Sequence, residues 1–174
     1  SLRRSARGPL GLILRAKGLQ PLALIEHGEP VLVTAHPDLE LPDATFRHVG
    51  PTVSGVPADP TEPTVLISLS TVRYRHLHRT WQRALDAVDG LPARVVATVG
   101  PAVDIEALSV PPSVELHRHL PHDSVLPDVS LVVSHGGNGT TMAALAHDVP
   151  VLVLPTDPNT DQPFVGRQIE RSGA

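Results

Sequence analysis

The sequence predicts an α/β fold in which helices cover both faces of a parallel sheet. Apolar runs such as Val65–Leu69 and Arg94–Val99 alternate with stretches of helical periodicity. Short continuous apolar runs are typical of strands buried on both faces, and parallel neighbours require crossover connections, which are usually helical. A glycine-rich turn at residues 135–139, between one such run and a helix-forming stretch, is the third observation. Turns of this kind lie at the carboxyl edge of such sheets, where ligands bind.

The first third of the chain has a different character. Residues 1–27 are predicted to be helical with a break from Gly18 to Pro21, and Val31–Thr34 to form a short strand. From Leu39 to Pro63 the chain is dense in Pro, Gly, Asp and Thr, which excludes a helix and indicates an extended connection. We therefore divide the chain into the end of one domain (1–50), a linker (51–63) and a second domain (64–174). Because it starts at Ser1 without a methionine, we expect a piece of a longer protein.

The elements of the second domain follow in regular order. After the strand at 65–69, Leu77, Trp81, Leu85 and Val88 recur at helical spacing, so a helix is expected over 75–89, ended by Gly90. Further strands are expected at 94–99, 114–116, 131–133 and 151–154, with a turn or short helix at 122–126. The loops that follow the strands should open on one rim, and they are residues 68–71, 100–101, 117–122, 135–141 and 155–162.

Composition excludes several classes of function. The net charge of −4 and pI of about 6.2 argue against a nucleic-acid partner. No apolar run approaches the roughly 20 residues that cross a bilayer, and no secretory cleavage pattern is present, so a cytoplasmic protein without a membrane partner is expected. The absence of cysteine excludes disulfides, thiolate nucleophiles and cysteine-bound zinc. A local basic cluster, Arg73–Arg79, is interpreted as a solvated helix start.

The segment His135–Thr141 carries the strongest chemical signal. Gly136 and Gly137 would let backbone N–H groups approach an anion closely, and Gly139 would permit a positive φ where the helix begins. Two threonines at the helix start can cap it and donate hydroxyls, while the histidine adds a further donor. This pattern predicts a phosphate site. The alternative is a strand-to-helix turn whose histidine is merely hydrogen-bonded.

Other nucleotide and hydrolase signatures are missing. The chain contains neither a Gly-x-x-x-x-Gly-Lys-Ser/Thr loop nor a Gly-x-Ser-x-Gly elbow. His117, His119 and His122 have only Asp123 as a carboxylate at ligand spacing, so no metal site is expected. The pair Asp161-Gln162, which is expected on the same rim as the phosphate site, can form hydrogen bonds with the hydroxyl groups of a ligand. A sugar nucleotide is therefore the expected ligand.

The motifs resemble a known family over about residues 30–174. They are Val49-Gly-Pro51, Ser68–Thr71, His119–His122, His135-Gly-Gly-x-Gly-Thr-Thr141, Val149-Pro150 and Asp161-Gln162. In this order they resemble the donor-binding half of nucleotide-sugar-dependent glycosyltransferases with two Rossmann-like domains (GT-B), of the bacterial natural-product and macrolide type. The resemblance implies an inverting transfer, without metal or other cofactor, from a UDP- or dTDP-sugar to a hydroxyl of a small-molecule acceptor.

The resemblance also implies roles for residues. The diphosphate would contact His135, Gly136, Gly137, Asn138, Gly139, Thr140, Thr141, Ser70 and Thr71. The base would lie against His119, Leu120 and Pro121, and the sugar against Asp161 and Gln162. Residues 1–50 would be the end of the acceptor-binding domain, which would be the partner of residues 64–174.

The chain departs from the family at several positions. Ala143 stands where many relatives have a ribose-contacting glutamate, which fits a dTDP donor, and Asp148 replaces a helix-terminating glycine. The family's catalytic histidine is expected upstream of Ser1. Two other functions stay open: a sugar-nucleotide 2-epimerase, and a non-catalytic partner that activates a true transferase.

Overall fold

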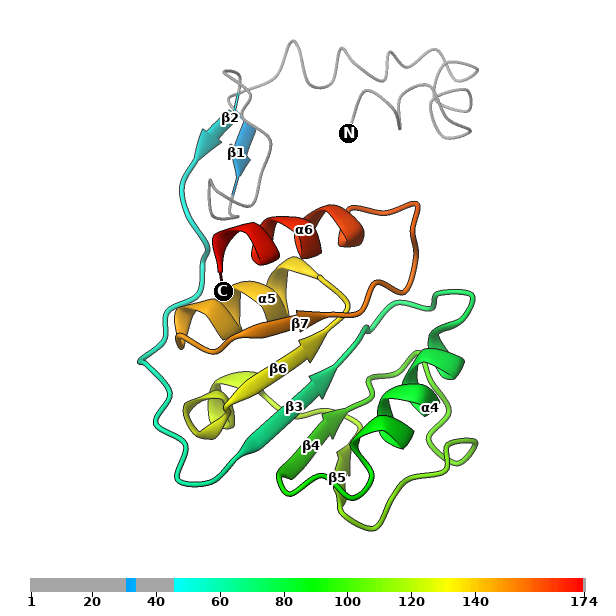
Figure 1. Ribbon diagram of the computed structural model, residues 1–174. Helices are drawn as coiled ribbons and strands as arrows, with labels where there is room; N and C mark the ends of the chain where they lie inside the picture. The colour runs from blue at the N-terminus through cyan, green and yellow to red at the C-terminus, as the bar shows by residue number, and fades with distance from the viewer. Residues whose placement is uncertain (1–30, 34–45, 174) are drawn as a thin grey trace, which may run out of the picture. The chain divides into compact units, whose positions relative to one another are not determined.

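The computed structural model describes residues 31–33 and 46–173 (Figure 1). Contacts divide the chain into two compact units, Ser1–Thr34 with Pro42–Gly50 and Ala35–Leu41 with Pro51–Ala174. In the first unit, strand β1 (Val31–Val33) pairs in parallel with β2 (Phe46–His48). Strand β2 was not expected, because the Pro- and Gly-rich composition around it indicated only extended chain. The expected helix over residues 1–27 lies outside the described residues.

The second unit contains a five-stranded sheet in the order β5-β4-β3-β6-β7, in which every pair is parallel. Its strands are β3 (Thr64–Ser68), β4 (Arg94–Thr98), β5 (Val114–His117), β6 (Leu131–Ser134) and β7 (Val151–Val153). Each lies within one residue of a predicted strand. The chain runs outward from β3 to β5 and then returns to place β6 beside β3. The strand order therefore reverses between β3 and β6, where open α/β sheets bind ligands.

Three helices and two short 3-10 turns complete this unit. They are α4 (Leu77–Val88), η2 (His122–Ser124), η3 (Leu126–Asp128), α5 (Asn138–Ala146) and α6 (Gln162–Ser172). The first of these confirms the predicted helix over 75–89. Helix α6 was missed, since Pro163 and Gly166 interrupt its pattern and it buries only Gln162 and Ile169. It ends at Gly173, which has φ 77°.

Two hydrophobic clusters show that helices cover both faces of the sheet, as predicted (Figure 1). Successive residues of one strand point to opposite faces. Ile67 accordingly packs in one cluster with Trp81 and Leu85 of α4. Its neighbour Leu66 packs in the other cluster, with side chains of α5, α6 and η3.

The segment that precedes β3 is extended, and it forms hydrogen bonds with other residues of the second unit. The N–H of Ala58 donates to the carbonyl of His147 at 2.8 Å, and His147 Nδ1 lies 2.8 Å from the carbonyl of Val56. The N–H of Asp59 donates to the carbonyl of Pro127 at 2.9 Å. The second half of residues 51–63 is thus bound to the sheet domain. The division into a 1–50 domain end and a 51–63 linker stays a prediction.

Candidate functional site

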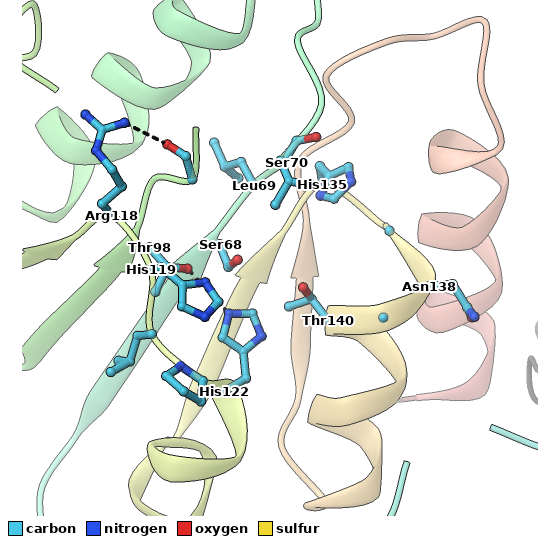
Figure 2. A pocket seen from close by; sticks show the side chains of 16 residues that line it. Ser68, Leu69, Ser70, Thr98, Arg118, His119, His122, His135, Asn138 and Thr140 are labelled. Atoms are coloured by element: carbon cyan, nitrogen blue, oxygen red, sulfur yellow. Dashed lines mark hydrogen bonds between the residues drawn. The ribbon is translucent and has the colours of Figure 1, made fainter. Parts of the chain in front are cut away.

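A cleft of about 400 Å³ lies at the carboxyl edge of the sheet, over the β3–β6 reversal (Figure 2). Its lining comes from the loops after β3, β4, β5 and β6, and consists of Ser68, Leu69, Ser70, Thr71, Thr98, Gly100, Arg118, His119, Leu120, Pro121, His122, His135, Gly137, Asn138, Gly139 and Thr140. Four of the five loops expected on one rim thus form one cleft. The fifth, residues 155–162, contributes no lining residue. This volume is in the usual range for small-molecule sites.

The first turn of α5 opens directly onto this cleft. Asn138, Gly139 and Thr140 all line it, and no side chain caps the turn. The first N–H groups of a helix have no partner within the helix, and they carry the positive end of its dipole. Figure 2 shows the Asn138 side chain pointing away from the centre of the cleft, so this residue offers its backbone amide. The turn is therefore built to receive an anion.

The threonines do not cap α5, contrary to prediction. The N-cap is Gly137, and both threonines lie inside the helix, with the N–H of Thr141 donating to the carbonyl of Gly137 at 3.1 Å. Thr140 lines the cleft. Thr141 is fully buried and outside the lining, and its Oγ1 has no hydrogen-bond partner.

The glycines of the turn act differently from the prediction. The positive φ, 89°, occurs at Gly136 and not at Gly139. A Cβ at Gly136 would lie 3.0 Å from Val153 Cγ1 and 3.2 Å from the carbonyl oxygen of Gln162, and Gly136 is absent from the lining. A Cβ at Gly137 would lie 2.5 Å from Cε1 of His135. Both glycines therefore make room for neighbouring protein groups.

His135 lies at one end of the cleft and packs near Tyr74. Its ring centroid lies 6.4 Å from that of Tyr74, tilted by 46°. Its Nδ1 is buried without a hydrogen-bond partner. Burial lowers the pKa of His135, and the negative charge of Asp161 acts in the opposite direction. Burial therefore favours the uncharged form of the imidazole.

The loop after β5 forms the opposite side of the cleft from His135 and Thr140 (Figure 2). The predicted residues His119, Leu120 and Pro121 all line it. His122, which belongs to the expected rim loop and the His119–His122 motif but was given no site role, also lines it, with Nε2 at 3.4 Å from Thr98 Oγ1. Burial lowers the pKa of His122, the negative charge of Asp123 opposes this, and His119 makes the smallest contribution, in the lowering direction.

Besides His122, sequence reasoning missed five lining residues as individuals: Ser68, Leu69, Thr98, Gly100 and Arg118. Their positions at the carboxyl ends of predicted strands would have been enough to predict them as lining residues. Arg118 is the arginine of the lining, and its Nη1 donates to the carbonyl of Gly100 at 3.4 Å.

Two predicted hydroxyl contacts differ in their availability. Ser70 lines the cleft, but its Oγ donates to the carbonyl of Val72 at 3.1 Å and accepts from the N–H of Val72 at 3.0 Å. Its hydroxyl thus stabilises its own turn. Thr71 is exposed at the cleft.

The predicted sugar-binding pair lies outside the lining. Gln162 is 2% exposed, and its Oε1 accepts from Thr156 N–H at 2.7 Å, Thr156 Oγ1 at 3.1 Å and Asp157 N–H at 3.2 Å. This side chain fixes the β7–α6 loop. Asp161 is exposed and lies near enough to His135 to influence its pKa.

The charge balance of the cleft favours an anion. Arg118 and the α5 amides line it, and no carboxylate does. The three histidines of the lining add ring nitrogens, and burial disfavours the charged form of His122 and His135. Within the described part of the chain, no cluster of three or more His, Cys, Asp or Glu residues could hold a metal ion. No described helix is long and apolar enough to span a membrane.

Comparison with known proteins agrees with this description. Residues 82–174, just over half of the chain, match the family "Erythromycin biosynthesis protein CIII-like, C-terminal domain". The five-stranded parallel sheet is that of a Rossmann-like domain, with the cleft at the reversal of strand order. The chain belongs to the erythromycin biosynthesis protein CIII-like family, as a C-terminal domain.

The similar proteins are glycosyltransferases of antibiotic and other natural-product biosynthesis. The chain is 31% identical over 163 residues to 4'-demethylrebeccamycin synthase of Lentzea aerocolonigenes. This alignment covers 87% of this chain and 36% of that protein. It aligns with the crystal structure of the kitacinnamycin glycosyltransferase at 25% identity and a TM-score of 0.68, over 99% of this chain and 50% of that one.

A third comparison, with spinosyn rhamnosyltransferase SpnG complexed with thymidine diphosphate, gives a TM-score of 0.65 at 24% identity and shows the shared fold. It covers 84% of this chain and 42% of that one. The chain spans about a third of the length of the curated relative it matches over 163 residues.

Proposed function

We propose that this chain is the donor-binding part of a glycosyltransferase that transfers a sugar from a nucleoside-diphosphate sugar to a hydroxyl of a small-molecule natural product. One observation carries the proposal: the unsatisfied first-turn amides of α5 open onto a cleft without carboxylates at the strand-order reversal. The natural-product relatives supply the reaction class.

The diphosphate would lie against the start of α5. Asn138, Gly139 and Thr140 line the cleft, so their backbone N–H groups would donate to the diphosphate, and the Thr140 hydroxyl would add a donor. His135 lines the cleft and would donate to the diphosphate from Nε2 in the tautomer that carries its hydrogen there, since Nδ1 is buried. As the bond from sugar to diphosphate breaks, negative charge grows on the leaving group. Donors fixed in advance stabilise that charge without reorganising, which lowers the barrier.

The nucleoside would lie toward the loop after β5. His119, Leu120 and Pro121 offer ring and apolar surface to a base, and Thr98 and His122 offer polar atoms beside it. A thymidine donor is supported by Ala143 in place of the relatives' glutamate. It is also supported by the thymidine diphosphate complex of a protein with this fold. Ala143 itself packs in the core with 7% exposure and lies outside the cleft lining, so the support from this position comes from the family resemblance alone.

The sugar would project toward Asp161. That carboxylate is exposed near His135 and can accept hydrogen bonds from sugar hydroxyls. Gln162 retains only its Nε2 for such a role, since Oε1 is engaged by the loop.

In the proposed reaction the acceptor hydroxyl attacks the anomeric carbon as the diphosphate leaves, with inversion and without a metal ion. The hydroxyl proton passes to a base expected in the acceptor-binding domain, to which we assign residues 1–50. The family resemblance supports these features. The stereochemistry of the product and retention of activity in EDTA, measured on the longer protein, test them.

Calorimetric titration of this chain with thymidine diphosphate, uridine diphosphate and thymidine tests donor binding. We expect one site that prefers the diphosphates to the nucleoside, and thymidine diphosphate to uridine diphosphate. Thr140→Val should weaken diphosphate binding about tenfold, the equivalent of about 1.4 kcal/mol. The matched control Thr80→Val, on α4 with its Oγ1 bonded to the carbonyl of His76, should bind as the parent does. Equal affinity for thymidine and thymidine diphosphate would refute the diphosphate site.

A further inference from the structure

A run of cationic side chains, which we name the basic segment (residues 73–79), lies between β3 and the first turn of α4. Its charged or titratable members are all exposed: Arg73, Arg75, His76, His78 and Arg79. The first turn of α4 contains no acidic residue. Among the described residues the structure records one salt bridge, between Arg94 and Glu115. Arg73, Arg75 and Arg79 therefore form no salt bridge with a carboxylate of the described chain.

The basic segment begins at the mouth of the cleft. Thr71, two residues before Arg73, lines the cleft. Tyr74 lies within the segment, and its ring packs 6.4 Å from the ring of His135. Arg73 and Arg75 are the sequence neighbours of Tyr74, so their backbones lie beside the rim of the cleft where His135 is found.

This position matters because the chain as a whole is acidic. A net charge of −4 repels an approaching nucleotide, which is itself an anion. A local excess of positive charge beside a cleft without carboxylates attracts a nucleotide that approaches the cleft from the side of the basic segment. Such fields raise association rates, and they weaken as salt screens them.

We propose that the basic segment steers the nucleoside-diphosphate sugar into the cleft, raising the association rate without contacting the bound ligand. The inference rests on the proposed function and extends it from the residues that hold the donor to those that guide its arrival. It replaces the interpretation of these residues as a merely solvated helix start. It assigns the segment a small anionic ligand and not an acidic protein.

Stopped-flow fluorescence with a mant-labelled thymidine diphosphate tests this proposal on the whole chain. The test variant is Arg75→Gln/Arg79→Gln. The matched control is Arg167→Gln/Arg171→Gln, which removes the same charge from exposed positions of α6. At low salt we expect the test variant to associate about 3- to 10-fold more slowly than the parent, with an unchanged dissociation rate. The control should associate within about twofold of the parent. The difference should vanish near about 0.5 M NaCl.

The other outcomes separate the two proposals. Binding by the parent with equal association rates for the test and control variants overturns steering and leaves the diphosphate site intact. A faster dissociation rate with an unchanged association rate also overturns steering, since the arginines would then hold the bound ligand. Failure of the parent to bind the labelled nucleotide refutes the proposed function itself. Mant-labelled thymidine should associate independently of salt in all three proteins.

Discussion

The imidazole of His135 occupies the space where a side chain at position 137 would lie. A Cβ built on Gly137 falls 2.5 Å from Cε1 and 2.6 Å from Nε2 of that ring. Real Cβ atoms essentially never make contacts this short, so a side chain at position 137 would require the His135 ring to move. His135, Gly136 and Gly137 thus pack together just before α5. The absence of a side chain at Gly137 leaves room for the His135 ring that lines the cleft.

Gly137→Ala should destabilise the fold by about 1–3 kcal/mol, because the new methyl group displaces the His135 ring. In a His135→Ala background the same change should cost less than about 0.5 kcal/mol, the small penalty of alanine relative to glycine at an N-cap. Urea unfolding of the four proteins of this cycle measures the coupling. Equal costs in both backgrounds would show that His135 is not the group in the way.

Asp148→Gly should stabilise the chain by about 0.5–1 kcal/mol, since Asp148 has a left-handed backbone at the end of α5. Its φ is 55°. The matched change Asp89→Gly, after α4, should destabilise, because Asp89 has a φ of −63° and gains only unfolded-state entropy from glycine. Thermal unfolding compares the two, and a loss of stability in Asp148→Gly would contradict the assigned backbone conformation.

Stability should fall as pH drops below neutrality. Burial lowers the pKa values of His122 and His135 below their ordinary 6.5, so the unfolded chain binds protons more readily than the folded one. Their contribution is complete above pH 6.5 and is lost as pH falls through the lowered values. Glu115, whose pKa is lowered mainly by its hydrogen bond from Arg94, acts only in a more acidic window.

Denaturant midpoints measured between about pH 7.5 and pH 5.5 check this, since Asp and Glu titrate mostly below that window. The double variant His122→Asn/His135→Asn should show a flatter profile than the parent. A profile as steep as the parent's would assign the pH dependence to other groups.

Gln162→Leu should cost about 1–3 kcal/mol, because it leaves the buried donors of Thr156 and Asp157 without their acceptor. If Gln162 acts only on the loop, the variant should keep the parent's ratio of affinities for thymidine diphosphate and its sugar conjugate. Calorimetry with both ligands gives that ratio. A selective loss of the conjugate with unchanged stability would favour direct sugar contact.

The sequence was sufficient to predict the sheet and the position of the cleft. Apolar runs at 65–69 and 131–133 could only be buried parallel strands, and right-handed crossovers then placed their carboxyl ends on one edge. Helix α6 was not predictable in the same way, because it buries only Gln162 and Ile169 and carries Pro163 and Gly166.

Roles within the site were harder to predict than its location. Spacing shows that Gly136, Gly137 and Gly139 share a turn, but not which of them has positive φ or which neighbour each one avoids. Thr141 was grouped with Thr140 by sequence, yet one residue along a helix turns its side chain by about 100° and moves it from the cleft to the interior.

The most direct test of the diphosphate site is an amide ¹H–¹⁵N titration of the chain with thymidine diphosphate. The account predicts the largest shift changes at the N–H groups of Asn138, Gly139 and Thr140, because these amides gain phosphate hydrogen bonds, and smaller changes around His119 and His122. Inorganic pyrophosphate should reproduce the first set without the second. Saturable binding that leaves the three α5 amides unshifted would contradict the assignment of the diphosphate to this helix.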